Sequence, residues 1–156
     1  FIKRCEGVGV LEPEPAIELG VTGPMLRASG VARDVRRDDP YSIYDRFDFE
    51  VVTEEAGDTL ARFRVRFREI FESLRIIEQA LEDLPEGEVR SPEVPKVIRP
   101  PKGVAYSRIE APKGELAYYV VSDGKSTSPY RLKIRSPAFC NLSAFPHYAT
   151  GRLSRT

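Results

Sequence analysis

The segment DTLARFRVRFREIFESLRIIEQALEDL, Asp58–Leu84, carries the strongest local pattern in this chain of 156 residues. Its apolar residues recur at alternating spacings of three and four, the heptad repeat of a helix that buries one stripe of its surface. We call these residues the seam: Leu60, Phe63, Phe67, Ile70, Leu74, Ile77, Leu81 and Leu84. Asp58 suits the N-cap, and Pro85 followed by Gly87 suits the end, so the sequence predicts a long helix over residues 57–84.

A helix with such a seam requires a partner, because most helical stability in proteins comes from packing of the apolar face rather than from propensity. The rest of the chain shows no second helical pattern of similar length. We therefore expect the partner helices to come from sequence outside this chain or from other subunits.

The segments around the helix predict an α+β fold, in which the long helix accompanies a small antiparallel β-meander. Strands are expected in AYSRIEAPKGELAYYVVSDG, with a tight turn at Pro112-Lys113-Gly114, and in PYRLKIRSP, where Tyr130, Leu132 and Ile134 share one face. The predicted organisation of the chain 1–156 is a loop-rich segment 1–56, the helix 57–84, a proline-rich linker 85–103, strands in 104–136 and a tail 137–156.

Within the loop-rich segment we expect a short helix with Pro15 in its first turn, stopped by Gly20, and a short strand at residues 47–53, FDFEVVT. The tail AFCNLSAFPHYATGRLSRT begins like a helix and then turns polar, so we expect it to fray. The chain also begins with FIKRCEG rather than with methionine, which indicates a fragment or a processed piece.

Composition excludes several classes of function. The 24 Lys and Arg residues balance the 24 Asp and Glu residues, which argues against a dedicated nucleic-acid binder. Cys5 and Cys140 lie far apart without a CxxC motif, so neither a disulfide framework nor a metal site is expected. The only histidine, His147, lies beside Pro146 without catalytic neighbours and is interpreted as a surface residue. We assign no catalytic residue.

Two groups of residues remain as site candidates. GVTGPMLRASG, residues 20–30, has a single charge, Arg27, among three glycines; this arginine either pairs with a nearby carboxylate or takes part in a site. The nearby carboxylates are Asp34, Asp38 and Asp39. Glu110 and Glu115 flank the predicted turn, where a salt network with Lys113 is favoured over an acid–base pair.

Several long motifs, in order, resemble one known family. GVTGPMLRASGVARDVRRDDPYSIYDRFDF, SLRIIEQAL, LPEGEV, IEAPKGELAYYVVSDG and PYRLKIRSPAF are similar to the D subunit, or 49-kilodalton subunit, of NADH-quinone oxidoreductase, respiratory complex I. The resemblance covers about Gly7 to Phe145. It implies a fragment of a fold distantly shared with the large subunit of nickel–iron hydrogenases, in which the long helix joins a central bundle.

The resemblance also implies a role in a proton-translocating NADH:quinone oxidoreductase. It places the chain in the peripheral arm at the cytoplasmic side of the cell membrane, touching the membrane only through the complex. A neighbouring subunit holds the terminal iron–sulfur cluster, quinone is the substrate of the complex, and this chain binds no cofactor. NADH is oxidised elsewhere in the complex.

For the glycine-rich loop, the resemblance implies either a wall of the quinone chamber or a packed core. The residues concerned are Gly23, Pro24, Met25, Leu26 and Arg27; Asp34, Glu110 and Glu115 are expected to form structural ion pairs. The family's quinone-headgroup histidine and tyrosine belong to an N-terminal portion that this sequence lacks, and the segment after LPEGEV is shorter than in many members. Two alternatives stay open: a subunit of a related membrane-bound hydrogenase or deazaflavin-linked dehydrogenase, and a non-catalytic truncated docking module.

Overall fold

The computed structural model describes residues 1–91 and 93–149. It has one long helix, α5 (Thr59–Glu82), and one three-stranded antiparallel sheet formed by β1 (Gly103–Ala111), β2 (Gly114–Ser122) and β3 (Arg131–Arg135). The strands follow one another in the order β1-β2-β3. The predicted α+β class, with its long helix and β-meander, is therefore confirmed.

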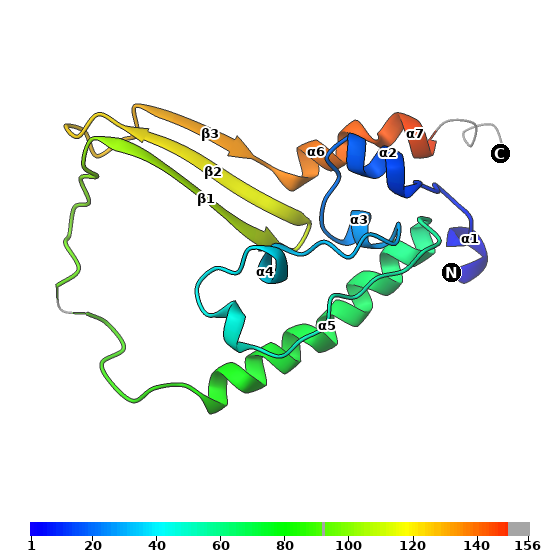
Figure 1. Cartoon of the computed structure of the whole chain (residues 1–156), viewed down its shortest axis with the longest axis horizontal. Coiled ribbons are helices and arrows are strands. Elements are labelled where there is room, and N and C mark those ends of the chain that lie inside the picture. Colours follow the sequence, from blue (N-terminus) through cyan, green and yellow to red (C-terminus); the bar gives the residue numbers. More distant parts are fainter. Residues whose placement is uncertain (92, 150–156) are drawn as a thin grey trace.

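The long helix and the sheet diverge from a body of short helices (Figure 1). The short elements are α1 (Ile2–Cys5), α2 (Pro13–Glu18), α3 (Pro24–Arg27), α4 (Val35–Asp38), the 3-10 helix η1 (Tyr44–Arg46), α6 (Pro137–Ser143) and α7 (Phe145–Ala149). The exposed residues 83–91 and 93–102 contain no helix or strand and connect the far end of α5 to the sheet. None of the helices among the described residues is long and apolar enough to cross a membrane.

The expectation of a fraying tail is wrong for residues 145–149, which form α7. Ala144, between α6 and α7, has no exposed surface, and Tyr148 packs against the main apolar cluster. This burial gives the segment a hydrophobic reason to stay helical. The remainder of the predicted tail, residues 150–156, lies outside the described residues.

The predicted strand at residues 47–53 is also wrong, although its alternation is real. Phe47 and Phe49 are buried while Asp48 between them is exposed. The segment is extended, but its backbone bonds to side chains of α5 instead of to another strand: the Asp48 N–H donates to Gln79 Oε1 at 2.8 Å, and the Glu50 N–H donates to Glu72 Oε2 at 2.8 Å. Period-two burial therefore reflects packing on a helix here, not sheet pairing.

The chain holds α5 by the face opposite the seam. Asp58 caps the helix, its Oδ1 accepting from the Ala61 N–H at 2.7 Å, and Val65, one heptad after Asp58, is fully buried. Val65 and Ala61 pack with Ala28 and Val52 in one apolar cluster. Further along the same face lie Glu72 and Gln79, the two residues that bond the extended segment.

The seam itself lies on the outside of the described chain. Leu60 at its beginning is buried, but Phe67 is 52% exposed and Leu74 is 51% exposed. The other exposed members are Phe63, Ile70, Ile77, Leu81 and Leu84. Rings stack along its first half, with Phe63 and Phe67 centroids 6.1 Å apart. The seam therefore presents the kind of surface that the sequence pattern predicts for a helix–helix contact.

The sheet is a regular meander whose first turn is the one predicted. Glu110 pairs with Glu115 in register, and Ala111 with Gly114 closes the hairpin. Gly114 has φ of 123°, in the region that favours glycine. The hairpin meets α4 through β1 and α6 through β2, and its turn approaches the glycine-rich loop at Gly23.

Candidate functional site

Two glycine segments meet back to back at the centre of the molecule. Gly23, with φ of 70°, precedes α3, and Gly114 lies in the hairpin turn. A Cβ on Gly23 would lie 2.8 Å from the Lys113 carbonyl carbon and closer still to the Gly114 backbone. Both positions thus need glycine because two backbones touch. This contact explains why the loop at residues 20–30 is rich in glycine.

Polar side chains lock the two segments together. The Glu115 N–H donates to Thr22 Oγ1 at 2.6 Å. Asn141 of α6 accepts from the Thr22 N–H at 3.0 Å through Oδ1, and its Nδ2 donates to the Lys113 carbonyl at 3.1 Å. Loop, turn and α6 therefore form one rigid junction that fixes where α3 starts.

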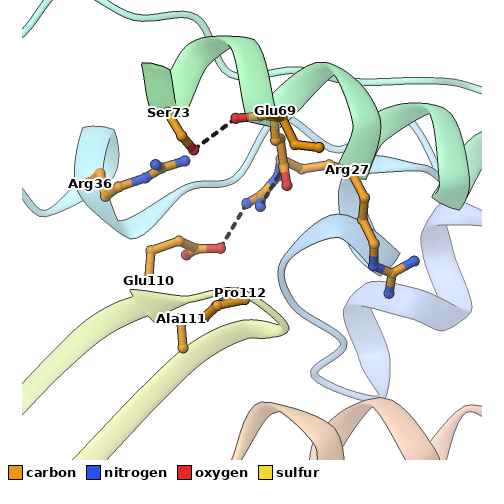
Figure 2. A pocket seen from close by; sticks show the side chains of 9 residues that line it. Arg27, Arg36, Glu69, Ser73, Glu110, Ala111 and Pro112 are labelled. Atoms are coloured by element: carbon orange, nitrogen blue, oxygen red, sulfur yellow. Dashed lines mark hydrogen bonds and ion pairs between the residues drawn. The ribbon is translucent and has the colours of Figure 1, made fainter. Parts of the chain in front are cut away.

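Arg27, at the end of α3, is buried with only 2% of its surface exposed. Its Nε donates to Glu69 Oε1 at 2.8 Å and its Nη1 to Glu110 Oε1 at 2.9 Å. Nη1 also donates to the Arg33 carbonyl at 2.8 Å. Figure 2 shows the guanidinium between Glu69 on α5 and Glu110 on β1. Arg27 thus joins the long helix to the sheet.

The aspartates near Arg27 in sequence have other main partners. Asp34 Oδ2 is 3.6 Å from Arg27 Nη1 but 2.6 Å from Arg36 Nη2. Asp38 accepts from the Asp34 N–H, and Asp39 pairs with Arg108 at 2.8 Å. Asp34 therefore lies at the edge of the cluster that Arg27 forms with Glu69 and Glu110, and Asp38 and Asp39 bond to other residues.

The charges in this cluster change the acidity of its carboxyl groups. Burial raises the pKa of Glu110, and the Asp34 charge adds to this, while the Arg27 charge only partly opposes it. Burial also acts on Asp34, but there the hydrogen bonds and charge of Arg36, with the charge of Arg27, outweigh it and hold the pKa of Asp34 below its usual value. Burial raises the pKa of Tyr41, whose hydroxyl accepts from the Glu110 N–H, to about 12.

Glu115 forms a second ionic group, and its partners are arginines rather than the expected Lys113. Its carboxylate lies 3.3 Å from Arg33, 3.6 Å from Arg135 and 3.8 Å from Arg108. Lys113 forms no ion pair with any described residue. Each carboxylate of the Glu110–Glu115 pair has its own cations, so the arrangement stabilises the hairpin and does not present a free acid–base pair.

Two cavities lined by Met25 or Arg27 open beside this junction, and a third, of about 280 Å³, is lined by Thr22, Leu26 and Glu115 among others. One, of about 380 Å³, is lined by Arg27, Arg36, Arg66, Glu69, Ile70, Ser73, Glu110, Ala111 and Pro112; Figure 2 shows Arg36 facing Glu110 across it. The other, of about 260 Å³, is lined by Met25, Arg66, Lys113, Ala138, Asn141, Leu142 and Tyr148. Of the five loop candidates, Gly23 and Pro24 are buried in packing, Leu26 is 3% exposed, and only Met25 and Arg27 reach these two cavities.

The remaining sequence candidates lie apart. His147 is exposed on α7. Cys5 and Cys140 are both partly buried free thiols. Among residues 1–91 and 93–149, no three His, Cys, Asp or Glu side chains converge as metal ligands would.

Sequence reasoning missed Glu69 and Arg36, which complete the Arg27 cluster. Glu69 lies outside the seam, in the arginine-rich first half of the helix; its position opposite the exposed stripe was the available signal. Arg36 follows Asp34 by two residues, and its Nε and Nη2 both bond that carboxylate. Only the helix α4 brings the two side chains into this bidentate geometry.

Comparison with known proteins gives a consistent result. Residues 1–100 and 92–154 match the family model described as respiratory-chain NADH dehydrogenase, 49 Kd subunit. The chain is 54% identical over 148 residues to the D subunit of the NADH-quinone oxidoreductase of Dehalococcoides mccartyi, covering 95% of this chain and 40% of that protein. It is 52% identical over 153 residues to the D subunit from Syntrophobacter fumaroxidans, covering 98% and 41%.

A third relative, the D subunit from Clostridium beijerinckii, is 51% identical over 151 residues, covering 97% of this chain and 40% of that protein. The chain thus spans about 40% of the length of the curated relatives it matches. Two of the motifs that suggested the resemblance, GVTGPMLRASGVARDVRRDDPYSIYDRFDF and IEAPKGELAYYVVSDG, contain Arg27 and Glu110 of the junction. From these matches, the chain belongs to the family of the 49-kDa subunit of respiratory-chain NADH dehydrogenase.

Proposed function

We propose that this chain is a scaffold part of a proton-translocating NADH:quinone oxidoreductase. The observation that carries the proposal is the exposed seam of α5, on a helix whose opposite face is held by the Arg27 junction. A stripe of that length is the surface of a helix that packs against others. In the complex, other parts of the D subunit and its neighbours in the peripheral arm would cover it.

The loop at residues 23–27 would contribute to the wall of the quinone chamber through Met25. Its side chain is packed in the core on one side and lines the 260 Å³ cavity on the other. Leu26 would support that wall from behind, and Arg27 would anchor it to α5 and β1 through Glu69 and Glu110. Mutually bonded loops of this kind hold a wall in place without moving during turnover.

The chain's own contribution to the chemistry would be to position the wall of the quinone chamber and to set the dielectric environment there. As the family resemblance implies, the terminal iron–sulfur cluster would be held by a neighbouring subunit, with quinone reduced beside it. The chain would sit peripherally, at the cytoplasmic side of the membrane, through the complex.

The comparisons favour this proposal over a hydrogenase or deazaflavin-linked dehydrogenase, because the three relatives are named as D subunits of NADH-quinone oxidoreductase. The docking-module alternative predicts the same exposed seam but a different activity: such a chain would assemble with the other subunits without supporting turnover. One experiment separates the two.

The test replaces the 151 matched residues of the Clostridium beijerinckii relative with this chain, and measures co-purification of the other subunits together with NADH:quinone reductase activity in membranes. Assembly with activity is the expected result. Assembly without activity would indicate docking alone, and failure to assemble would contradict the scaffold role. A Met25→Lys variant should lower activity while leaving assembly intact, whereas Lys125→Gln, in a distant exposed loop, should change neither.

A further inference from the structure

We propose that the 260 Å³ cavity beside the loop binds the head of an anionic amphiphile, a long-chain carboxylate of the fatty-acid type. The carboxylate would lie between Arg66 and Lys113, and the chain would extend past Tyr148. The proposed function also uses Met25 as a wall of this cavity, but the inference does not rest on that function, because a neutral quinone has no charge to pair with Arg66 and Lys113.

The charge of the cavity is the first observation. Arg66 and Lys113 both line it, and no carboxylate does. Neither side chain forms an ion pair within the described part of the chain; Arg66 has only a hydrogen bond from Nη1 to the Arg62 carbonyl at 3.3 Å. This differs from the neighbouring Arg27 and Arg36, which both bond buried carboxylates. Two cations without counter-charges in one hollow favour an anionic group.

The apolar lining is the second observation. Met25, Leu142 and Tyr148 form walls of the same cavity, so an anion bound there would have hydrocarbon beside it. Tyr148 also lines a separate cavity of about 280 Å³, with Val8, Gly9, Thr59, Arg62, Phe145 and Ala149. The Arg62 guanidinium lies over the Tyr148 ring, 5.3 Å from its centroid, which fixes the ring between the two cavities.

Together these features select a ligand with a charged head and an apolar chain. A small anion such as phosphate would pair with the two cations in full contact with water, where ion pairs contribute little, whereas the chain of an amphiphile would cover the pair and exclude water from it. A neutral amphiphile would gain the apolar contacts but leave both cations unmatched. A carboxylate with a chain of several methylenes uses both parts of the site, and each buried methylene adds to affinity.

The experiment measures binding to the full 156-residue chain by isothermal titration calorimetry, with each amphiphile below its critical micelle concentration. The probes are dodecanoate, dodecanol, hexanoate and inorganic phosphate. We expect dodecanoate to bind about tenfold more tightly than dodecanol, as one charge-assisted contact implies, and more tightly than hexanoate, with no measurable phosphate binding. Equal affinity for dodecanoate and dodecanol would overturn the proposal, because the exposed seam would bind both alike. Phosphate binding as tight as dodecanoate would overturn it as well.

Variants locate the site. Arg66→Gln with Lys113→Gln should weaken dodecanoate binding about tenfold or more while leaving dodecanol unchanged. The matched control is Arg64→Gln, which removes a cation from the same helix without altering either cavity. Tyr148→Ala should weaken dodecanoate more than hexanoate. If Arg64→Gln weakens binding as much as the double variant, the site is not this cavity. If an acidic segment of a partner protein occupies the cavity instead, the double variant should fail to assemble with the other subunits while its affinity for dodecanoate stays unchanged. That result would overturn the proposal.

Discussion

Replacing Arg27 by methionine tests whether the buried junction joins the long helix to the sheet. Methionine keeps an unbranched apolar stem, although a shorter one, and removes the charge and every hydrogen-bond donor. It would leave Glu69 and Glu110 without the cation that they contact at 2.8 and 2.9 Å, and Asp34 without one at 3.6 Å. Breaking a buried pair by removing one partner costs about 3–5 kcal/mol, and Arg27 is only 2% exposed. We therefore expect Arg27→Met to lower the free energy of unfolding by that amount.

The cost should depend on pH in a defined direction. In the folded protein the pKa of Glu110 is raised by burial, so the folded chain holds this proton more tightly than the unfolded chain. That contribution to stability is greatest at low pH and is lost as the pH rises through the folded pKa. Without Arg27 the pKa of Glu110 rises further, and the pKa of Asp34, which Arg27 helps to lower, rises toward its usual value. The loss of stability should therefore be larger at about pH 8 than at about pH 5.

The assay is urea unfolding of the full chain, followed by far-ultraviolet circular dichroism at these two pH values. Arg64→Met is the matched control: it changes an exposed arginine of the same helix and should cost less than about 0.5 kcal/mol. Adding Glu110→Gln to Arg27→Met should recover part of the loss at the higher pH. A cost below about 1 kcal/mol for Arg27→Met, as for an exposed pair, or a cost that falls as the pH rises, would refute the reasoning.

Three further predictions concern the glycine contact, the helix cap and the seam. Gly23→Ala should lower the unfolding free energy by more than about 2 kcal/mol, because its Cβ overlaps the hairpin backbone, whereas Gly7→Ala, at similar φ but in open space, should cost only about 1 kcal/mol; equal losses in urea melts would disprove the close contact. Asp58→Ala should cost about 1–2 kcal/mol at about pH 7. Burial would raise the pKa of Asp58, but backbone N–H bonds outweigh it and hold this pKa below its usual value. The stabilisation is therefore present above about pH 4 and lost as the pH falls through the folded pKa, so the gap between variant and wild type should narrow in acid; a constant gap would contradict this. Phe67→Ser, on the exposed seam, should change the unfolding free energy of the isolated chain by less than about 1 kcal/mol, whereas Val65→Ala, on the buried face, should cost about 1–3 kcal/mol. In the assembled complex, Phe67→Ser should reduce co-purification of the other subunits. Unchanged recovery of those subunits would show that the seam is not an interface.

Some of the candidate site was accessible from sequence because its determinants are local. The glycines at 20, 23 and 30 around Arg27 marked a loop with an unusual backbone, and Glu110 was recognised as charged and adjacent to a turn. The identity of the pairing was not accessible, because Arg27 is separated from Glu69 by 42 positions and from Glu110 by 83. Of the aspartates nearby in sequence, Asp34 lies 3.6 Å from Arg27, whereas Asp38 and Asp39 have other partners.

Sequence by itself determined the long helix, its cap at Asp58, the hairpin turn and the family. Each rests on residues adjacent along the chain, where periodicity, capping and φ preference act directly. Only the tertiary structure decided which face of α5 this chain holds. The seam is the more apolar face, yet Val65 on the opposite side is fully buried, because Ala28 of the loop and Val52 of the extended segment pack against it there. Burial of a side chain depends on the residues that pack against it from other segments, and the apolar periodicity of one helix does not show those residues.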